Sequence, residues 1–333
     1  MPQASLAARS PDELAQTLRE LVDAGLFGLE PALEPPSLYE PVRYVLQASG
    51  KRVRPVLLLL TAEALGADRV RALPAALAVE VFHNFTLVHD DIMDHALTRR
   101  GAATVHARWD ESTAILCGDY LVALSYDLLA RVDSPHLPDL FGTYFRMVRH
   151  LCEGQAMDKE FESRSDVTVE EYFQMIYRKT GALIETSFEL GGWIAGADAK
   201  LREALRDLGR HVGLAFQIQD DLLDLVADDA RWGKKVGGDL QEAKKTYLLL
   251  RALEVAEGDD RAWFRRIVDT PGLPEAEIGE ARARMDRLGV LEEARRAVLK
   301  HSEAALAGLA VLPESSARAT LHHLIARLQH RIH

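Results

Sequence analysis

The sequence lacks the features typical of secreted and membrane proteins. Only two of its 333 residues are cysteines, Cys117 and Cys152, which is too few for a disulfide framework. The longest aliphatic run, Val56 to Leu60, is far too short to span a bilayer. Residues 1–12 contain no long apolar stretch, so we expect no signal peptide. These absences predict a cytoplasmic protein with no transmembrane segment.

Strand patterns and an excess of positive charge are also scarce. Alternating runs of Val, Ile and Thr are nearly absent, whereas the strong helix formers Ala, Leu, Arg and Glu dominate. The net charge of −11 argues against nucleic acid as the main partner. Because 48% of the residues are hydrophobic, the chain can bury a large core. We therefore predict an all-α fold, a single large helical bundle that forms one domain over residues 1–333.

Apolar residues recur at helical spacing along most of the chain. They predict helices over residues 11–25, 38–47, 54–65, 73–94, 107–130, 137–162, 169–192, 200–225 and 241–256. Two or three more helices are expected between residues 261 and 333. Clusters of glycine, proline and serine separate these segments, as an up-and-down bundle requires. No linker is long or biased enough to divide the chain.

Two copies of the pattern DDxxD stand far apart in the sequence, at residues 90–94 and 220–224. In a helix, residues i and i+4 share a face, so Asp90 points the same way as Asp94, and Asp220 the same way as Asp224. Carboxylates crowded on one helical turn repel one another unless a cation binds them. Their hard oxygen atoms suit Mg²⁺. The alternative is a pair of solvated acidic helix ends.

Basic residues cluster around the first aspartate motif. The segment GKRVRP at residues 50–55 places three cations before a proline that can open a helix, where anions bind. Arg99 and Arg100 follow the motif and could clamp phosphate oxygens or act as counter-charges to the aspartates. His83 lies two helical turns before Asp90 and could donate to a second anion. The alternatives are an ordinary basic loop and a structural histidine.

Polar residues inside apolar helices accompany the second motif. Lys179 could hold an anion, and the hydroxyl of Thr180 and the amide oxygen of Gln217 could stabilise a nearby carbocation. Lys234 and Lys244 flank a glycine-rich segment that could close over a diphosphate. A buried hydrogen-bonding pair and a plain surface loop are the alternative interpretations.

Little machinery for nucleophilic or acid–base chemistry accompanies these groups. No Ser-His-Asp arrangement, CxxC pair or Walker sequence is present. Aspartates that bind metal, together with cations around an apolar helical cavity, suit the removal of a diphosphate leaving group. The cavity would then shelter the carbocation that remains.

In these motifs, in order from about Leu38 to Leu250, the chain resembles the trans-isoprenyl diphosphate synthases, or polyprenyl synthetases. The resemblance implies a helical bundle around a deep cavity, the isoprenoid synthase fold, and a homodimer. It implies Mg²⁺-dependent condensation of isopentenyl diphosphate with an allylic diphosphate, by ionisation, condensation and proton elimination. The departing diphosphate would be the base.

The resemblance also implies a role for each aspartate. Asp90 and Asp94 would hold two Mg²⁺ ions, and Asp220 would hold the third. The aspartates that would orient waters and lysines are Asp91, Asp221 and Asp224.

The remaining implied ligands are divided between the two substrates. The allylic diphosphate would be bound by Arg99, Lys179, Lys234 and Lys244. Isopentenyl diphosphate would be bound by Gly50, Lys51, Arg54, His83 and Arg100. Thr180 and Gln217 would face the reacting carbons. The chain departs from the family pattern at Ser49 and Ala243, where many members have glycine.

Residues upstream of the first aspartate motif set the product length in this family. Phe85 lies roughly 7.5 Å and Phe82 roughly 12 Å along the helix from Asp90, so a cavity floored there is shallow. Together with the small Thr86, this resembles synthases of geranylgeranyl diphosphate, the C20 product. Phe82 could shorten the product to farnesyl diphosphate, C15. Ordinary core packing of both phenylalanines is the other interpretation.

Three other functions stay open from the sequence. A class I terpene cyclase shares the fold, but its second metal motif usually differs from residues 220–224. A non-catalytic subunit of a heteromeric synthase typically loses one aspartate motif, and this chain keeps both. A Mg²⁺-dependent hydrolase in a helical bundle is the third alternative. Incubation with isopentenyl and allylic diphosphates would separate all of these.

Overall fold

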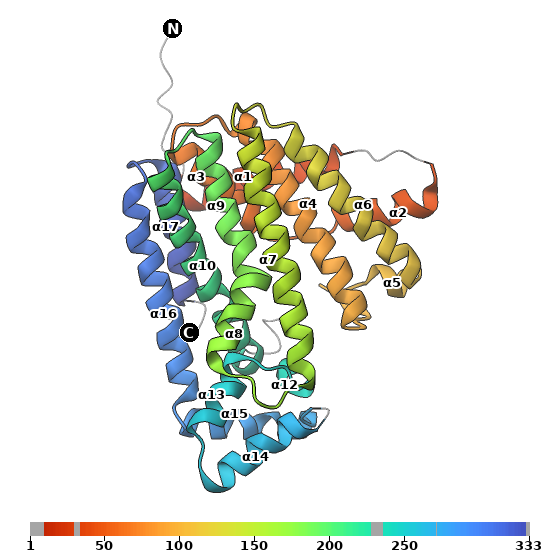
Figure 1. The fold of residues 1–333 in the computed structure, drawn as a ribbon, viewed down its shortest axis with the longest axis vertical. Helices are drawn as coiled ribbons and strands as arrows, with labels where there is room; N and C mark the ends of the chain where they lie inside the picture. Colours follow the sequence, from red (N-terminus) through yellow and green to blue (C-terminus); the bar gives the residue numbers. More distant parts are fainter. Residues whose placement is uncertain (1–9, 30–33, 228–235, 271, 331–333) are drawn as a thin grey trace. The chain divides into compact units, whose positions relative to one another are not determined.

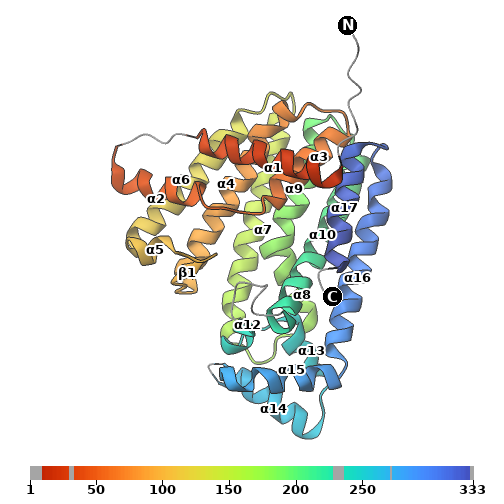
Figure 2. The same ribbon diagram turned by 180° about the vertical axis from the view of Figure 1, so that it is seen from behind.

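The computed structural model describes residues 10–29, 34–227, 236–270 and 272–330 (Figures 1 and 2). The all-α prediction is confirmed, because helices dominate and the only strands in these ranges form one short hairpin. Its strands are β1 (Thr98–Arg99) and β2 (Ala102–Ala103), which pair antiparallel.

Contacts within the chain group it into two compact units. Unit 1 comprises the described parts of Met1–Thr143, Ser187–Leu205 and Leu309–His323. Its helices are α1 (Pro11–Phe27), α2 (Pro36–Leu46), α3 (Val53–Ala64), α4 (Arg69–Met93), α5 (Val105–Arg108), α6 (Glu111–Ala130) and the short 3₁₀ turn η3 (Leu309–Val311).

Unit 2 comprises the described parts of Tyr144–Thr186, Arg206–Gly308 and Leu324–His333. Its elements are α8 (Val169–Ile176), η1 (Tyr177–Gly181), α12 (Gly238–Gln241), α13 (Tyr247–Val255), α14 (Gly258–Asp269), η2 (Glu275–Glu277), α15 (Ile278–Arg287) and α16 (Val290–Gly308). Four helices contribute residues to both units: α7 (Leu137–Ser163), α9 (Ala182–Ile194), α10 (Ala199–Val226) and α17 (Ser316–His330). A single domain over residues 1–333 stays a prediction.

Helix α4 is central to unit 1, where it packs against α3 and α6. Asp68 caps its first turn by accepting a hydrogen bond from the backbone N–H of Val70. The small buried residues Ala75, Ala76 and Ala78 let the neighbouring helices approach closely. This packing fixes the end of α4, and the first aspartate motif is at that end.

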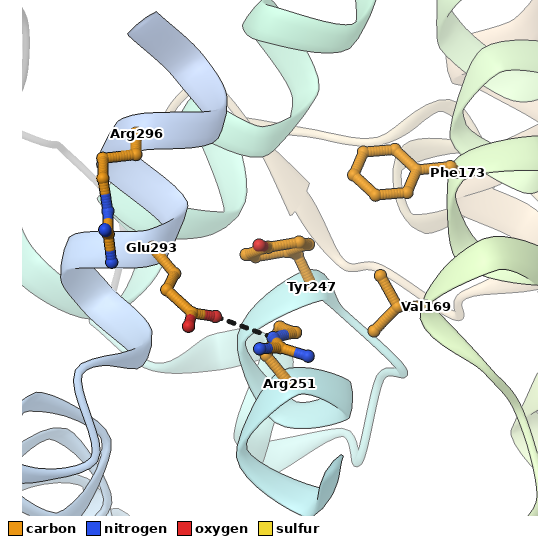
Figure 3. Close-up of a pocket in the computed structure, with 6 residues that line it drawn as sticks. All are labelled: Val169, Phe173, Tyr247, Arg251, Glu293 and Arg296. Carbon is orange, nitrogen blue, oxygen red and sulfur yellow. Dashed lines mark hydrogen bonds and ion pairs between the residues drawn. The ribbon is translucent and has the colours of Figure 1, made fainter. Parts of the chain in front are cut away.

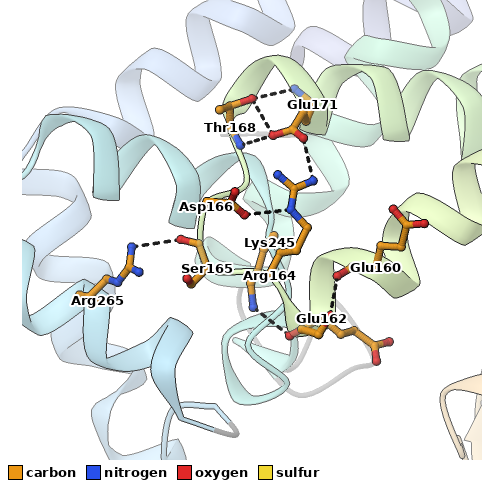
Figure 4. A network of polar contacts seen from close by, with 10 residues as sticks. Glu160, Glu162, Arg164, Ser165, Asp166, Thr168, Glu171, Lys245 and Arg265 are labelled. Atoms are coloured by element: carbon orange, nitrogen blue, oxygen red, sulfur yellow. Dashed lines mark hydrogen bonds and ion pairs between the residues drawn. The ribbon is translucent and has the colours of Figure 1, made fainter.

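Unit 2 has its own core, in which α8, α10 and the helices from α13 to α16 bury apolar side chains. The start of α8 is fixed by a polar network (Figure 4). Thr168 and Glu171 form a reciprocal capping box, and Arg164 bridges Asp166 and Glu171 at 2.9 and 2.7 Å. This network sets the register of the helix that leads to Lys179 and Thr180.

Four helix predictions differ from the structure. The helix predicted over residues 107–130 is two helices, α5 and α6, separated by Trp109 and Asp110. The helix predicted over residues 169–192 is interrupted by the π-helical turn η1. The helix predicted over 241–256 is two helices, because Ala243 has a φ of 52°, which cannot continue a right-handed helix. The nearby Lys245 is buried and donates to the carbonyls of Ala243 and Glu162 (Figure 4). The described part of residues 261–333 also contains more helices than predicted.

Helix α6 is the one described helix that is long and apolar enough to cross a membrane by those two criteria alone. It packs along α4 and buries Leu121, Leu128 and Leu129 within unit 1. A core helix meets the same criteria, so the described residues contain no clear membrane span.

Candidate active site

The predicted site residues fall into two groups, one in each unit. The first aspartate motif, the basic residues near it and the two phenylalanines lie in unit 1. The second aspartate motif, Lys179, Thr180, Gln217 and Lys244 lie in unit 2. Lys234 lies outside the described residues. Each group is described below within its own unit.

The hairpin after α4 positions two arginines. Its two-residue turn, Arg100 and Gly101, has φ angles of 53° and 79°, as a type I′ turn requires. Arg99 Nε donates to Asp91 Oδ1 at 2.7 Å, and Arg100 Nη1 donates to the carbonyl of Ser49 at 2.9 Å. Arg99 is therefore a counter-charge to the aspartate motif, whereas Arg100 is tied to Ser49, which directly precedes the GKRVRP segment.

Arg52, in the centre of that segment, has a structural role. Its buried guanidinium donates to Asp23 and Glu80, each at 2.8 Å, and to the carbonyl of Ala48 at 2.7 Å. Because all of these partners are internal, Arg52 anchors the segment and leaves the exposed Lys51 and the half-buried Arg54 beside it.

Gly50 occupies a crowded position in the same segment. A Cβ atom there would lie 2.9 Å from Arg52 Nη1 and 3.0 Å from Arg100 Nη1. A side chain would therefore displace two guanidinium groups, which explains why glycine suits this position.

His83 stands among these cations. Burial, and then the charges of Arg54, Arg100 and Arg99, hold its pKa well below the usual value. His83 is therefore neutral at pH 7. Arg54 Nη1 lies 3.2 Å from His83 Nε2, and because a guanidinium only donates, Nε2 accepts and Nδ1 carries the proton. The same positive field that suppresses protonation of His83 would attract an anion.

The first aspartate motif ends α4. The N–H of Asp94 donates to the carbonyl of Asp90 at 2.8 Å, so the two residues are one helical turn apart, as predicted. Asp90 is half-exposed and Asp94 exposed, whereas Asp91 is buried against Arg99. Burial raises the pKa of Asp91 despite the opposing effect of Arg99. The motif thus presents Asp90 and Asp94 to solvent and uses Asp91 to hold the hairpin.

The second motif has the same division of roles. Asp221 is buried and accepts from the hydroxyl of Tyr172 at 2.6 Å, the side chain of Gln217 at 3.0 Å and the N–H of Tyr247 at 3.2 Å. Burial raises its pKa to about 7, although these hydrogen bonds oppose the shift. Asp220 stays half-exposed on the same helix.

Carboxylates crowd the second motif. Asp224 accepts from the backbone N–H of Asp239 at 3.1 Å. The pKa of Asp239 is raised well above normal by burial and by the charges of Asp224 and Asp221. A divalent cation at this place would relieve the repulsion, and hard carboxylate oxygens suit Mg²⁺.

No group of three histidine, cysteine or carboxylate side chains in the described ranges could enclose a metal by itself. Mg²⁺ usually keeps several water molecules and binds substrate phosphates beside one or two protein carboxylates. The residues therefore fit a metal that a phosphate ligand helps to hold, rather than a closed protein cage.

The turn η1 positions Lys179 and Thr180. Lys179 Nζ pairs with Asp158 of α7 at 2.6 Å, and Thr180 Oγ1 donates to Gln217 Oε1 of α10 at 3.0 Å. Gln217 in turn donates to Asp221, so one chain of hydrogen bonds links the turn to the second aspartate motif. The predicted pair of Thr180 and Gln217 is thus brought together.

Two glycines let other helices pack directly on this turn. A Cβ at Gly154 of α7 would lie 2.3 Å from the backbone N of Lys179, and a Cβ at Gly213 of α10 would lie 2.6 Å from Gly181 Cα. Both contacts are with backbone, which cannot rotate away as a side chain can. The glycines therefore fix the widened turn where it is, and such turns are common at functional sites.

Gly154→Ala is expected to lower kcat about ten- to hundredfold, because its methyl group would push the backbone of Lys179 out of place. Gly142→Ala, in the same helix, is the matched control, since its Cβ would meet nothing within 4 Å. Turnover and circular dichroism measured on both variants check the prediction. A folded Gly154→Ala protein with the control's kcat would contradict it.

The predicted floor residues lie on one face of α4. Phe82 is 1% exposed, and its ring lies 5.1 Å from that of the half-buried Phe85. Phe85 also meets His89 edge to face at 4.8 Å. The ring of His89 fills the space above Gly118 of α6, where a Cβ would lie 2.1 Å from its Nε2. His89 is thus a packing residue beside the phenylalanines.

Lys244 and Ala243 follow the second motif. Lys244 Nζ pairs with Glu242 at 2.9 Å. Ala243 has the left-handed φ of 52°, which costs a residue with a Cβ about 1–2 kcal/mol. Glycine, which has no Cβ, would adopt this φ without that cost, so alanine at this position carries a backbone strain that glycine would avoid.

Several contributors to the site were not identified from the sequence. They are Asp158, Tyr172, Tyr247, Gly154 and Gly213. Asp158 lies 21 residues from its partner Lys179 in the sequence, and Tyr172 lies 49 residues from its partner Asp221. No local motif marks contacts of that range, so only the fold reveals them.

Comparison with known proteins gives consistent matches over most of the chain. Residues 35–285 match the polyprenyl synthetase family model. The chain is 40% identical over 291 residues to the short chain isoprenyl diphosphate synthase of Methanothermobacter thermautotrophicus, covering 87% of this chain and 89% of the relative. It is 38% identical over 323 residues to a geranylgeranyl pyrophosphate synthase of Geoglobus acetivorans, covering 96% and 99%.

A solved structure is equally similar. The geranylgeranyl pyrophosphate synthetase of Pyrococcus horikoshii superposes with a TM-score of 0.90 at 40% identity, covering 96% of this chain and 99% of that one.

Proposed function

The chain belongs to the polyprenyl synthetase family, and on that premise we propose that it makes geranylgeranyl diphosphate from isopentenyl diphosphate and an allylic diphosphate. As a family member it is a prenyltransferase. The observation that carries the proposal is the shared construction of the two aspartate motifs. In each, one carboxylate is buried and held by the protein, while its neighbour reaches solvent.

The basic residues of unit 1 suit isopentenyl diphosphate. We propose that Lys51, Arg54 and Arg100 bind its phosphates, with Gly50 leaving room for the guanidinium groups. His83 would add a neutral donor, because Arg54 occupies Nε2 and leaves Nδ1–H. A neutral donor among cations orients an anion without adding a charge that must be desolvated.

The polar residues of unit 2 suit the allylic partner. Lys179, held by Asp158, would bind its diphosphate together with Arg99, Lys234 and Lys244. Thr180 uses its proton toward Gln217, so the lone pairs of its oxygen are available to a carbocation. The departing diphosphate would then take the proton, as the family resemblance implies.

Proteins of this family generally use Mg²⁺, and we propose that three ions bind, two at Asp90 and Asp94 and one at Asp220. The bound metal would neutralise the charge that develops on the leaving diphosphate. Asp91, Asp221 and Asp224 would contribute indirectly, by holding Arg99, Gln217 and the backbone of Asp239. We also propose a homodimer in the cytoplasm.

The decisive test is incubation with isopentenyl diphosphate, each allylic diphosphate in turn and Mg²⁺, followed by chromatography of the products. Geranylgeranyl diphosphate as the main product is expected. Farnesyl diphosphate would support the shorter product, for which the fully buried Phe82 is the structural argument. A cyclic hydrocarbon or inorganic diphosphate without condensation would refute the proposal.

Arg54→Ala is expected to raise the KM for isopentenyl diphosphate at least about tenfold, because a charge-assisted hydrogen bond contributes about 1.5–3 kcal/mol. The KM for the allylic substrate should change far less. Steady-state kinetics with each substrate varied separately check this. Arg71→Ala is the control, since Arg71 bonds only the carbonyl of Asp133 among the described residues. Equal effects on both substrates would show that the two pockets are misassigned.

A further inference from the structure

Unit 2 contains a pocket to whose side chains the proposed reaction assigns no substrate or metal (Figure 3). Its volume is about 360 Å³, and it is a shallow hollow that opens to solvent. The lining residues come from three helices: Val169 and Phe173 of α8, Tyr247 and Arg251 of α13, and Glu293 and Arg296 of α16.

One side of the pocket is apolar. The rings of Phe173 and Tyr247 lie 5.8 Å apart at 60°, with Val169 beside them. Figure 3 shows the Tyr247 ring between Phe173 on one side and Glu293 on the other. A ligand with a flat or branched apolar body could pack against these two rings.

The other side carries two arginines, one paired and one exposed. Arg251 Nε donates to Glu293 at 2.7 Å and its Nη1 donates to Glu254 at 2.6 Å, so Arg251 is neutralised and fixed. Arg296 is exposed and has no hydrogen bond or ion pair with any described residue. Because Glu293 and Glu254 both bond Arg251, the positive charge that a ligand would meet is that of Arg296. A guanidinium at the edge of a hollow favours an anion.

The pocket is joined to the second aspartate motif. The N–H of Tyr247 donates to Asp221 Oδ2 at 3.2 Å, and the hydroxyl of Tyr172 donates to the same oxygen at 2.6 Å. The Tyr172 ring lies 5.7 Å from Phe173 and 6.2 Å from Tyr247. A ligand packed on the Phe173 and Tyr247 rings would therefore contact Tyr247, whose backbone holds Asp221, and Phe173, whose ring neighbours Tyr172.

We propose that this pocket binds a small organic anion with an aromatic or branched apolar body, and that its occupation alters how the second aspartate motif binds Mg²⁺ and diphosphate. The first part is independent of the proposed reaction, whereas the second part rests on the metal role proposed for Asp220. The pocket and the aspartate motif would be coupled if the organic anion binds more tightly to one arrangement of Asp221 than to another.

The binding test uses naphthalene-1-sulfonate as probe and the neutral naphthalene-1-sulfonamide as its matched control. Titration calorimetry on the full chain, with Mg²⁺ and inorganic diphosphate saturating, keeps the probe out of the phosphate sites. Arg296→Glu should weaken sulfonate binding about tenfold or more. Arg295→Glu should leave it unchanged, because Arg295, the residue before Arg296 in α16, is a partner of Glu292 and does not line the pocket. The neutral sulfonamide should bind wild-type protein weakly. Its affinity should be similar to that of the sulfonate for the Arg296→Glu variant.

Equal sulfonate affinity in the two arginine variants would overturn the site, and so would no binding at millimolar probe. The coupling is tested by titrating Mg²⁺ with diphosphate in the presence and absence of saturating probe. An apparent Kd shifted about threefold or more in wild type, and unshifted in Arg296→Glu, is expected. An identical Kd with and without bound probe would overturn the coupling. Neither measurement uses product formation, so a failed prenyl transfer assay would not be mistaken for failure of the pocket.

Discussion

Asp90→Ala and Asp220→Ala are each expected to lower turnover roughly a thousandfold or more, because the leaving diphosphate carries charge that Mg²⁺ must neutralise. Both side chains reach solvent, and the buried neighbours Asp91 and Asp221 provide the structural hydrogen bonds. The fold should therefore survive either change. Steady-state turnover at saturating Mg²⁺, with circular dichroism on the same samples, checks both statements.

The matched control is Asp119→Ala, which removes an exposed carboxylate from α6. It should keep near-wild-type turnover, since a surface charge contributes little by itself. Asp221→Ala should differ from Asp220→Ala by lowering the melting temperature as well, because it leaves Tyr172 and Gln217 without their shared acceptor. Wild-type turnover in Asp90→Ala or Asp220→Ala would refute the metal assignment.

Phe85→Ala is expected to lengthen the main product by one or more five-carbon units. Helical side chains lean toward the N-terminus of the helix, so Phe85 covers the surface on the N-terminal side of its own Cα. Phe82 lies behind it, with the two ring centroids 5.1 Å apart. The double variant Phe82→Ala/Phe85→Ala should lengthen the product further. Because Asp90 and Asp94 are unchanged, the first condensation should slow only modestly. Chromatography of the products measures the length.

Core packing makes a different forecast for the same residues. A buried phenylalanine cut to alanine costs about 3–5 kcal/mol of stability, whatever its role in the cavity. Phe264→Ala provides the comparison, because Phe264 is fully buried in the core of unit 2. It should lower the melting temperature without changing product length. If Phe85→Ala behaves in the same way, the floor of the cavity lies elsewhere.

The helical class and the aspartate motifs could be predicted because their signals are local. Apolar spacing predicted α1, α3, α7 and α10 to within a few residues, and the i, i+4 relation of Asp90 and Asp94 is preserved at the end of α4. Ala243 was marked as a departure from the sequence alone, and its left-handed backbone gives the reason.

The assignment of individual charges could not be made in this way. Arg52 and Arg54 are two residues apart in one basic segment. Arg52 is buried and donates hydrogen bonds to Asp23 and Glu80, whereas Arg54 is half-buried and contacts His83. Burial depends on which helices pack around a residue. The sequence of a basic segment does not indicate which of its charges point inward and which point outward.

The sequence by itself thus determined the helical class, the family and the residues proposed to bind metal and diphosphate, because each of these depends on periodicity or on short spacing. Only the tertiary structure decided which aspartate of each motif is buried, where the helix at Lys179 widens and which glycines hold it there. Those properties arise from close contacts between segments such as Gly154 and Lys179, or Tyr172 and Asp221. Such contacts are set by packing, and packing joins residues that no local pattern connects.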